Sequence, residues 1–227
     1  MKFLVHNIFA ALIVVVAALE AAKVDVDKEN ECANAKMDIC NKRVKKAFVK
    51  GGRMGLSTRE IYCSSMKDLS KCIESQLQSG NLCNSDKLRK YHFVVMAYLR
   101  MDKLMSTCAD DMKDKFKEKV MSQFLSVPEF NKFQEFRTLA FEEEPANVND
   151  CAKKSHDQCI TLFTGMQQQD EKNLCNGVTQ FIQCYQTNKC LTSRLSITFA
   201  DLIREMSAEL IDAFKAHSMC EVDKTEL

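Results

Sequence analysis

Two short stretches of the chain share one cysteine spacing. Cysteines stand at 63, 72 and 83 in the first and at 175, 184 and 190 in the second, with eight residues between the first two each time. Asn81 and Asn188 each stand two positions before the third cysteine. The shared spacing indicates that one cysteine-bearing unit occurs twice in the chain.

The equal spacing extends to six cysteines in each half. The first and second are 8 positions apart, the third and fourth 9, and the fourth and sixth 36, in both halves. Equal spacings predict a repeated unit. The twelve cysteines are Cys32, Cys40, Cys63, Cys72, Cys83, Cys108, Cys151, Cys159, Cys175, Cys184, Cys190 and Cys220.

The first residues predict an export signal. Lys2 precedes an apolar run from Ile8 to Leu19, which is short for a membrane span of about 20 residues. Small residues follow, and we expect cleavage between Ala18 and Ala22. An even number of cysteines in an exported chain predicts disulfides formed in an oxidising compartment.

The net charge and the scarcity of metal ligands argue against nucleic-acid-binding and metal-binding proteins. The net charge of +1 gives no overall attraction to nucleic acid. The sequence has no Cys-x-x-Cys pair, and only His92, His156 and His217 follow the signal, so we expect neither a metal nor another cofactor.

Apolar periodicity predicts three helices in each half and almost no strand. In the first half they cover residues 29–49, ended by Gly51 and Gly52, then 57–78, opened by a capping box of Ser57 and Glu60, then 85–108. In the second half they cover 150–163, 170–185 and 192–219. Further helical segments and an acidic linker at 142–147 separate the halves.

We therefore expect an all-α fold of two tandem disulfide-stapled three-helix units with an extra helical segment between them. The expected boundaries are 1–21 for the signal peptide, 22–110 for the first repeat, 111–148 for the connector and linker, 149–222 for the second repeat and 223–227 for the tail.

Helix geometry restricts the disulfides without fixing them. Cysteines nine positions apart on a helix face opposite sides, so Cys63 and Cys72 should bond to different neighbours, as should Cys175 and Cys184. Six cysteines in each unit favour bridges within the unit. Which of the 15 pairings each unit adopts stays open.

A basic stretch is the strongest charge feature. It could bind a glycan, an anionic lipid head or an acidic receptor, or it could simply place solvated cations in the C-terminal half of a helix. Its cations are Lys42, Arg43, Lys45, Lys46, Lys50 and Arg53.

Candidates for catalysis are few. His156 stands beside Asp157, and His217 stands near Cys220. Because a lone histidine on a charged helix is expected at the surface and oxidised cysteines are not nucleophiles, we expect no enzyme. Fourteen Phe and twelve Met could line a pliable ligand cavity or simply fill a helical core.

The chain ends in Lys224-Thr225-Glu226-Leu227, a loose variant of the signal that retains proteins in the endoplasmic reticulum. Secretion is the expectation, and retention in the lumen is the alternative. No Asn-x-Ser/Thr glycosylation acceptor occurs, so we interpret the asparagines before cysteines as caps and turns.

The cysteine spacing, with Leu69 or Phe181 inside it, resembles that of secreted cysteine-rich helical domains of unknown function that are expanded in nematodes. The resemblance lies in Cys63, Cys72 and Cys83 and in the corresponding Cys175, Cys184 and Cys190. It implies short stapled helices after a signal peptide and brings no catalytic residues.

Two functions follow as hypotheses. The first is a secreted, non-enzymatic binding or effector protein that contacts an extracellular protein or glycan, which predicts an exposed patch and no interior void. The alternative is an extracellular carrier of small hydrophobic ligands or lipids, which predicts a cavity lined by Phe and Met. Neither partner can be identified from the sequence.

Overall fold

The computed structural model describes residues 28, 31–78, 86–108, 131–169, 174–216 and 220 of the 227-residue chain. These residues form helices and no β-strand, as the sequence predicted. After an N-terminal helix at residues 31–53 come α2 (Thr58–Gln78), α3 (Asp86–Leu104), α5 (Asn131–Glu142), α6 (Asp150–Gln169), α7 (Leu174–Thr187) and α8 (Arg194–Ala216).

The N-terminal helix ends later than predicted, at residue 53 rather than 49. Gly51 lies inside it, where an added Cβ would stand 2.6 Å from Ile61 Cγ1, so this glycine allows close packing against α2. The chain leaves the helix at Gly55, whose φ of 69° is the left-handed conformation that favours glycine at a helix end. The predicted stop at Gly51 and Gly52 was therefore wrong.

The observed starts of two helices agree with the sequence predictions better than the end of the N-terminal helix does. The Ser57 backbone N–H donates to Glu60 Oε2 at 2.9 Å, and the Glu60 N–H donates to Ser57 Oγ at 3.3 Å, which confirms the capping box. Asn149 caps α6 by accepting a 2.8 Å hydrogen bond from the Ala152 N–H. Local signals fix both starts because each cap involves residues three positions apart.

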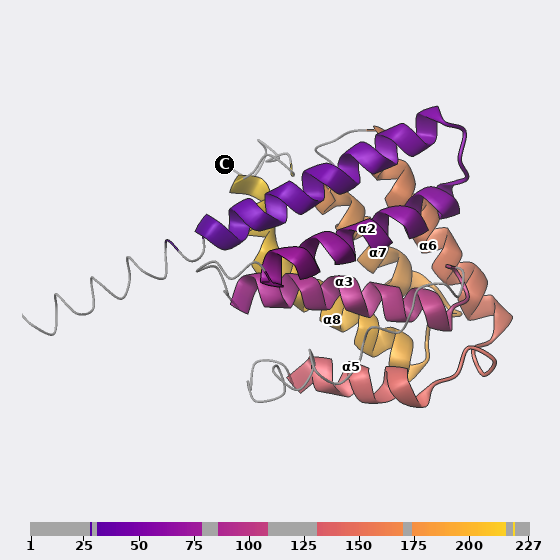
Figure 1. Ribbon diagram of the computed structural model, residues 1–227. Helices are drawn as coiled ribbons and strands as arrows, with labels where there is room; N and C mark the ends of the chain where they lie inside the picture. Colours follow the sequence, from indigo (N-terminus) through magenta and orange to yellow (C-terminus); the bar gives the residue numbers. More distant parts are fainter. Residues whose placement is uncertain are drawn as a thin grey trace, which may run out of the picture.

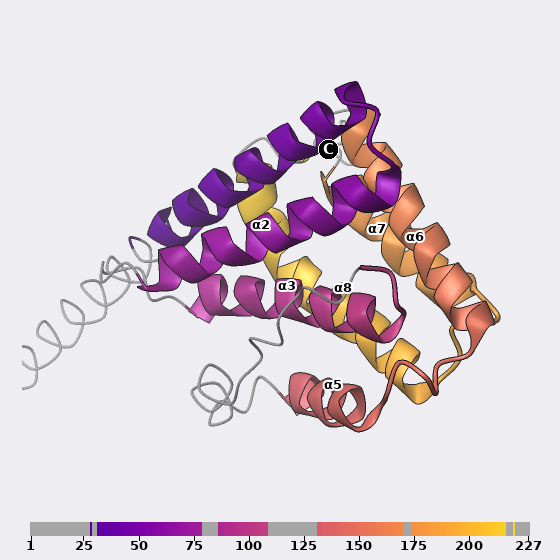
Figure 2. The same cartoon turned by 45° about the vertical axis from the view of Figure 1, so that its right-hand side comes forward.

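The helices of the two halves pack against each other (Figures 1 and 2). The N-terminal helix, α2 and α3 lie side by side in both views, and α6, α7 and α8 pack behind and across them. α2 packs on α6, α3 packs on α8, and α5 packs on α8 and α3. Arg100 of α3 anchors α5 by donating from Nε to the Ala140 carbonyl at 2.8 Å.

The buried residues of both halves form one continuous hydrophobic core. Phe181 is fully buried near its centre, and its ring centroid lies 4.9 Å from Tyr185, 5.0 Å from Tyr98 and 6.1 Å from Phe199. Tyr98 comes from the first half and the others from the second. Offset and edge-to-face aromatic pairs add to the burial of their area, so this cluster joins the halves.

Five disulfides are described, each within one half. The second cysteine bonds to the fourth and the third to the sixth in both halves. The bridges are Cys40–Cys72, Cys63–Cys108, Cys159–Cys184, Cys175–Cys220 and Cys151–Cys190, with Cα separations of 5.4–5.7 Å. Cys63 and Cys72 thus bond to different neighbours, and so do Cys175 and Cys184, as helix geometry predicted.

Helix boundaries in the second half also differ from the prediction. α6 continues to Gln169 instead of ending near Phe163, and α7 begins at Leu174 instead of Asp170. α5 is the short helix expected before the acidic linker. The predicted signal peptide, the helix predicted from the apolar spacing at residues 112–124 and the C-terminal tetrapeptide lie outside the described residues.

Candidate functional site

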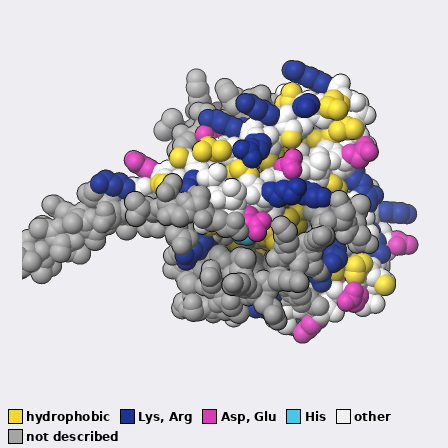
Figure 3. Space-filling model, in the orientation of Figure 1, with side chains coloured by type: hydrophobic (Ala, Val, Ile, Leu, Met, Phe, Trp, Pro, Cys, Tyr) yellow, Lys and Arg dark blue, Asp and Glu magenta, His cyan; other side chains and the backbone are white. Residues whose placement is uncertain are grey.

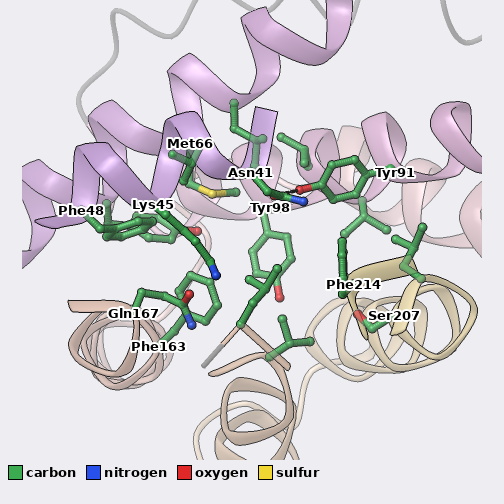
Figure 4. Close-up of a pocket in the computed structure, with 18 residues that line it drawn as sticks. Asn41, Lys45, Phe48, Met66, Tyr91, Tyr98, Phe163, Gln167, Ser207 and Phe214 are labelled. Carbon is green, nitrogen blue, oxygen red and sulfur yellow. Dashed lines mark hydrogen bonds between the residues drawn. The ribbon is translucent and has the colours of Figure 1, made fainter. Parts of the chain in front are cut away.

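An apolar cavity of about 70 Å³ lies where six helices meet (Figure 4). For comparison, an engineered apolar cavity of about 150 Å³ takes up benzene. Eleven of the eighteen lining residues are aliphatic, Met or Phe, and three are Tyr. The lining consists of Asn41, Val44, Lys45, Phe48, Tyr62, Met66, Leu69, Tyr91, Val94, Val95, Tyr98, Phe163, Gln167, Leu174, Val178, Ser207, Leu210 and Phe214.

Helical periodicity brings these side chains to one place. On the N-terminal helix the lining positions are 41, 44, 45 and 48, and on α3 they are 91, 94, 95 and 98. Both sets follow the i, i+3, i+4, i+7 pattern of a single helix face. The two faces therefore oppose the lining residues of α6, α7 and α8, and Figure 4 shows them converging.

A surface groove of about 520 Å³ adjoins the cavity between α7 and α8. Val178, Ser207 and Phe214 line both spaces, so these three side chains form the wall between them. Phe214 is buried and packs edge-to-face on Tyr91, with ring centroids 5.8 Å apart. The groove has the volume of an ordinary small-molecule site, whereas the inner cavity is much smaller.

Two buried polar groups at the cavity lack partners among the described residues. The Tyr91 hydroxyl donates to Asn41 Oδ1, but Asn41 Nδ2 has no acceptor. The hydroxyl of Tyr98 also has no hydrogen-bond partner, although its residue is only 8% exposed. Buried polar groups are nearly always paired, so these two require an explanation.

A fully buried polar network lies beside the cavity. His156 Nε2 is 2.9 Å from Asp102 Oδ1, and His156 Nδ1 is hydrogen-bonded to the Tyr185 hydroxyl. The Tyr62 hydroxyl donates to Asp102 Oδ1 and Oδ2 at 3.3 and 3.2 Å. The network joins α2, α3, α6 and α7, and Tyr62 connects it to the cavity wall.

Burial is the largest cause of the raised pKa values of Asp102 and of the tyrosines around it. It raises the pKa of Asp102, while the hydrogen bond and charge of His156 and the hydrogen bond from Tyr62 act in the opposite direction. Burial also raises the pKa of Tyr62 and of Tyr98, and the nearby Asp102 carboxylate raises both further. The tyrosine hydroxyls at the cavity are therefore hydrogen-bond donors at neutral pH.

The interpretation of His156 as a surface residue was wrong. Its side chain is fully buried because Asp102 and Tyr185 satisfy both ring nitrogens in the core. It does not line either described cavity. His92 is also buried, on α3, and His217 lies outside the described residues. Because both ring nitrogens bind buried partners, this arrangement fits a structural network.

The basic stretch divides into two parts. Lys42, Arg43, Lys46, Lys50 and Arg53 are exposed, and Figure 3 shows cationic side chains along the face that carries the N-terminal helix. Lys42 Nζ pairs with Asp38 at 2.7 Å. Lys45 instead is half-buried and lines the cavity, with its side chain directed toward Gln167 in Figure 4.

No described helix is long and apolar enough to cross a bilayer. No group of three or more His, Cys, Asp or Glu among the described residues could hold a metal ion.

Comparison with known proteins adds no relative. No protein-family model matches the chain, and neither the curated proteins nor the solved structures include a significant match.

Sequence reasoning missed the cavity residues. The sequence analysis placed Lys45 in one basic stretch with five cations that are exposed. Its spacing from Asn41 and Phe48 puts all three on one helix face, and this spacing could have indicated that Lys45 faces the cavity. The partners of His156 gave no signal, because they lie 54 and 29 positions away.

Proposed function

We propose that the protein is an exported, non-enzymatic binding protein that carries a small hydrophobic molecule. The observation that carries this proposal is the apolar cavity at the centre of an otherwise continuous core. A space without atoms forfeits dispersion contacts and costs stability, so a structural core would be expected to fill it. A ligand that fills the cavity restores those contacts.

The unpartnered groups support the same proposal. Asn41 Nδ2 and the Tyr98 hydroxyl would each lose their hydrogen bonds to water on folding without replacing them. Ligand sites typically combine an apolar lining with a few polar groups that orient the ligand. A bound molecule with an acceptor atom would satisfy these donors.

The framework suits export. Five disulfides are typical of oxidising compartments, and the predicted signal peptide agrees with that location. The bridges would hold the helices around the cavity when no ligand is bound. Retention in the lumen through the C-terminal tetrapeptide remains the alternative.

Native mass spectrometry of the protein secreted by cultured cells tests the proposal. We expect one apolar small molecule per chain, recovered by solvent extraction. In Val178→Phe the added ring should occupy the cavity and displace the ligand. The matched control is Ile197→Phe, because Ile197 is 52% exposed on α8. A ligand-free wild type that also binds no added apolar molecule would rule out the carrier function.

The exposed basic stretch favours a second candidate, contact with an anionic protein or glycan. Arg43, Lys46, Lys50 and Arg53 follow helical spacing on the exposed side of the N-terminal helix. Retention on a heparin column should fall with rising salt and with the Lys46→Glu and Lys50→Glu changes. Equal retention of wild type and variants would remove this candidate.

A further inference from the structure

The N-terminal helix has a second face, opposite to the one that lines the cavity. We infer that this outer face, together with the turn that follows the helix, docks the protein on the surface of a membrane rich in anionic lipid. The inference goes beyond the proposed carrier function and does not depend on a ligand in the cavity.

Helical spacing separates the two faces of this helix. The residues that line the cavity stand at positions 41, 44, 45 and 48. An exposed stripe consists of Ile39, Arg43, Lys46, Lys50 and Arg53. Because a helix turns by about 100° per residue, this stripe lies on the side opposite to the cavity. It is about 21 Å long, because each residue adds about 1.5 Å.

No described acid compensates the charge of the stripe. From residue 39 to residue 59 every charged residue is Lys or Arg. The four cations of the stripe form no ion pair with any residue in the described part of the chain. The acid that precedes them on the helix, Asp38, is already paired with Lys42 at 2.7 Å. The stripe is therefore free to attract the head groups of anionic lipids.

Exposed apolar side chains at both ends of the stripe favour a bilayer over other anionic partners. Ile39 is 49% exposed at one end, and Met54 and Leu56 are 63% and 42% exposed in the turn at the other end. Figure 3 shows hydrophobic and cationic side chains together at the upper right, where the N-terminal helix of Figure 1 ends. A sulfated glycan would leave these apolar side chains in water, whereas a bilayer takes them up beneath its head groups.

Backbone hydrogen bonds hold the apolar turn against the cationic helix. The Met54 N–H donates to the Lys50 carbonyl at 3.0 Å, and the Leu56 N–H donates to the Gly51 carbonyl at 3.2 Å. These bonds keep both apolar side chains beside the last turn of the helix. Neither side chain belongs to the core, so changing them should leave the fold intact.

Co-sedimentation with vesicles tests the inference. We expect the protein to bind phosphatidylcholine vesicles that contain about 30% phosphatidylserine, and to bind pure phosphatidylcholine weakly. Binding should fall with rising salt. Lys46→Gln combined with Lys50→Gln should lower the affinity about 25-fold, because each cation near an anionic membrane contributes about fivefold. The control Lys154→Gln combined with Lys189→Gln removes the same charge from exposed positions of the second half and should bind as the wild type does.

A single tryptophan reports whether the turn enters the bilayer. The chain has no Trp, so the tryptophan fluorescence of Met54→Trp comes from that position alone. We expect its emission to shift to shorter wavelength with anionic vesicles and not with heparin, because only a bilayer removes the ring from water. Ile197→Trp, at an exposed position on α8, should show no shift with either. Thermal unfolding verifies that each variant is folded.

Three results would overturn the inference. The first is equal binding to the two kinds of vesicle, and the second is equal loss of affinity in the two double variants. The third is an unchanged emission of Met54→Trp on vesicles that bind the protein. Binding to heparin without binding to vesicles would also overturn it and would favour the glycan as partner. The carrier function is tested separately by the ligand content of the protein, so it stands in each of these cases.

Discussion

Tyr62 and Tyr98 line the same cavity from α2 and α3, but their hydroxyls differ in hydrogen bonding. The Tyr62 hydroxyl donates to the buried carboxylate of Asp102, whereas the Tyr98 hydroxyl has no partner among the described residues. Both side chains are more than nine-tenths buried. The hydroxyl of Tyr62 therefore stabilises the fold, whereas the hydroxyl of Tyr98 is left to donate a hydrogen bond to a ligand.

This difference predicts opposite effects of removing one oxygen atom. Tyr62→Phe should lower the free energy of unfolding by about 1–3 kcal/mol, because it leaves part of the Asp102 carboxylate unsatisfied. Tyr98→Phe should leave it unchanged or raise it by about 1 kcal/mol, because no hydrogen bond is lost. Urea denaturation measures both. Equal destabilisation by the two changes would contradict the assignment.

The buried pair of Asp102 and His156 should be strongly coupled. His156→Leu alone should cost about 3–5 kcal/mol, since it leaves the buried carboxylate without its main partner. The double change with Asp102→Leu should cost less than the sum of the single changes by about 1–3 kcal/mol. A double-mutant cycle in urea gives the coupling directly.

A nearby acid provides the control for that cycle. Asp157 follows His156 in the chain, but it is partly exposed and lies 3.7 Å from Arg59. Asp157→Leu should change the free energy of unfolding by less than about 1 kcal/mol. Additive effects of Asp102→Leu and His156→Leu would show that the network is not a unit.

His92 should make the protein less stable in acid. Burial lowers the pKa of His92 below its usual value of 6.5, and the negative charge of Glu74 opposes this effect only in part. Below about pH 6.5 the unfolded chain therefore binds more protons than the folded one, and the free energy of unfolding falls with pH until the folded-state pKa is passed. Above about pH 6.5 His92 is neutral in both the folded and the unfolded chain, so this contribution is constant there.

The variant His92→Gln isolates the contribution of His92 to this loss of stability in acid. The free energy of unfolding should be measured from about pH 7.5 to about pH 5 for both proteins, and the variant should lose less on acidification. Parallel curves would mean that His92 does not contribute to the acid sensitivity.

Local features of the fold could be read from the sequence, and contacts between distant residues could not. The Ser57–Glu60 capping box depends on residues three positions apart, and it was predicted correctly. The end of the N-terminal helix was not, because Gly51 is required by its contact with Ile61 rather than by a turn. Amphipathic spacing placed the helices, but it could not say which faces would meet.

The same distinction applies to the candidate site. The cavity depends on how the faces of Asn41–Phe48 and Tyr91–Tyr98 meet helices from the other half of the chain. The Phe and Met content predicted that these residues could line a cavity. Three tyrosines also line it, and the role of each depends on the hydrogen-bond partner of its hydroxyl. Composition alone could not distinguish Tyr62 from Tyr98.

The repeated pairing predicts one more disulfide. In the second half the first cysteine bonds to the fifth, as Cys151–Cys190. Cys32 is also disulfide-bonded, and the same pairing in the first half would join it to Cys83, which lies outside the described residues. Peptide mapping without reduction should recover one species containing both cysteines. A Cys32 peptide linked to any other cysteine would contradict the repeated pairing.

Isotope-edited nuclear Overhauser spectroscopy shows directly whether an apolar ligand occupies the cavity. With a carbon-13-labelled apolar small molecule added to the protein, we expect contacts from the ligand to the methyl groups of Val94, Val178 and Leu210, which line the cavity. Contacts confined to exposed methyl groups such as those of Ile197, or no contacts at all, would contradict the account.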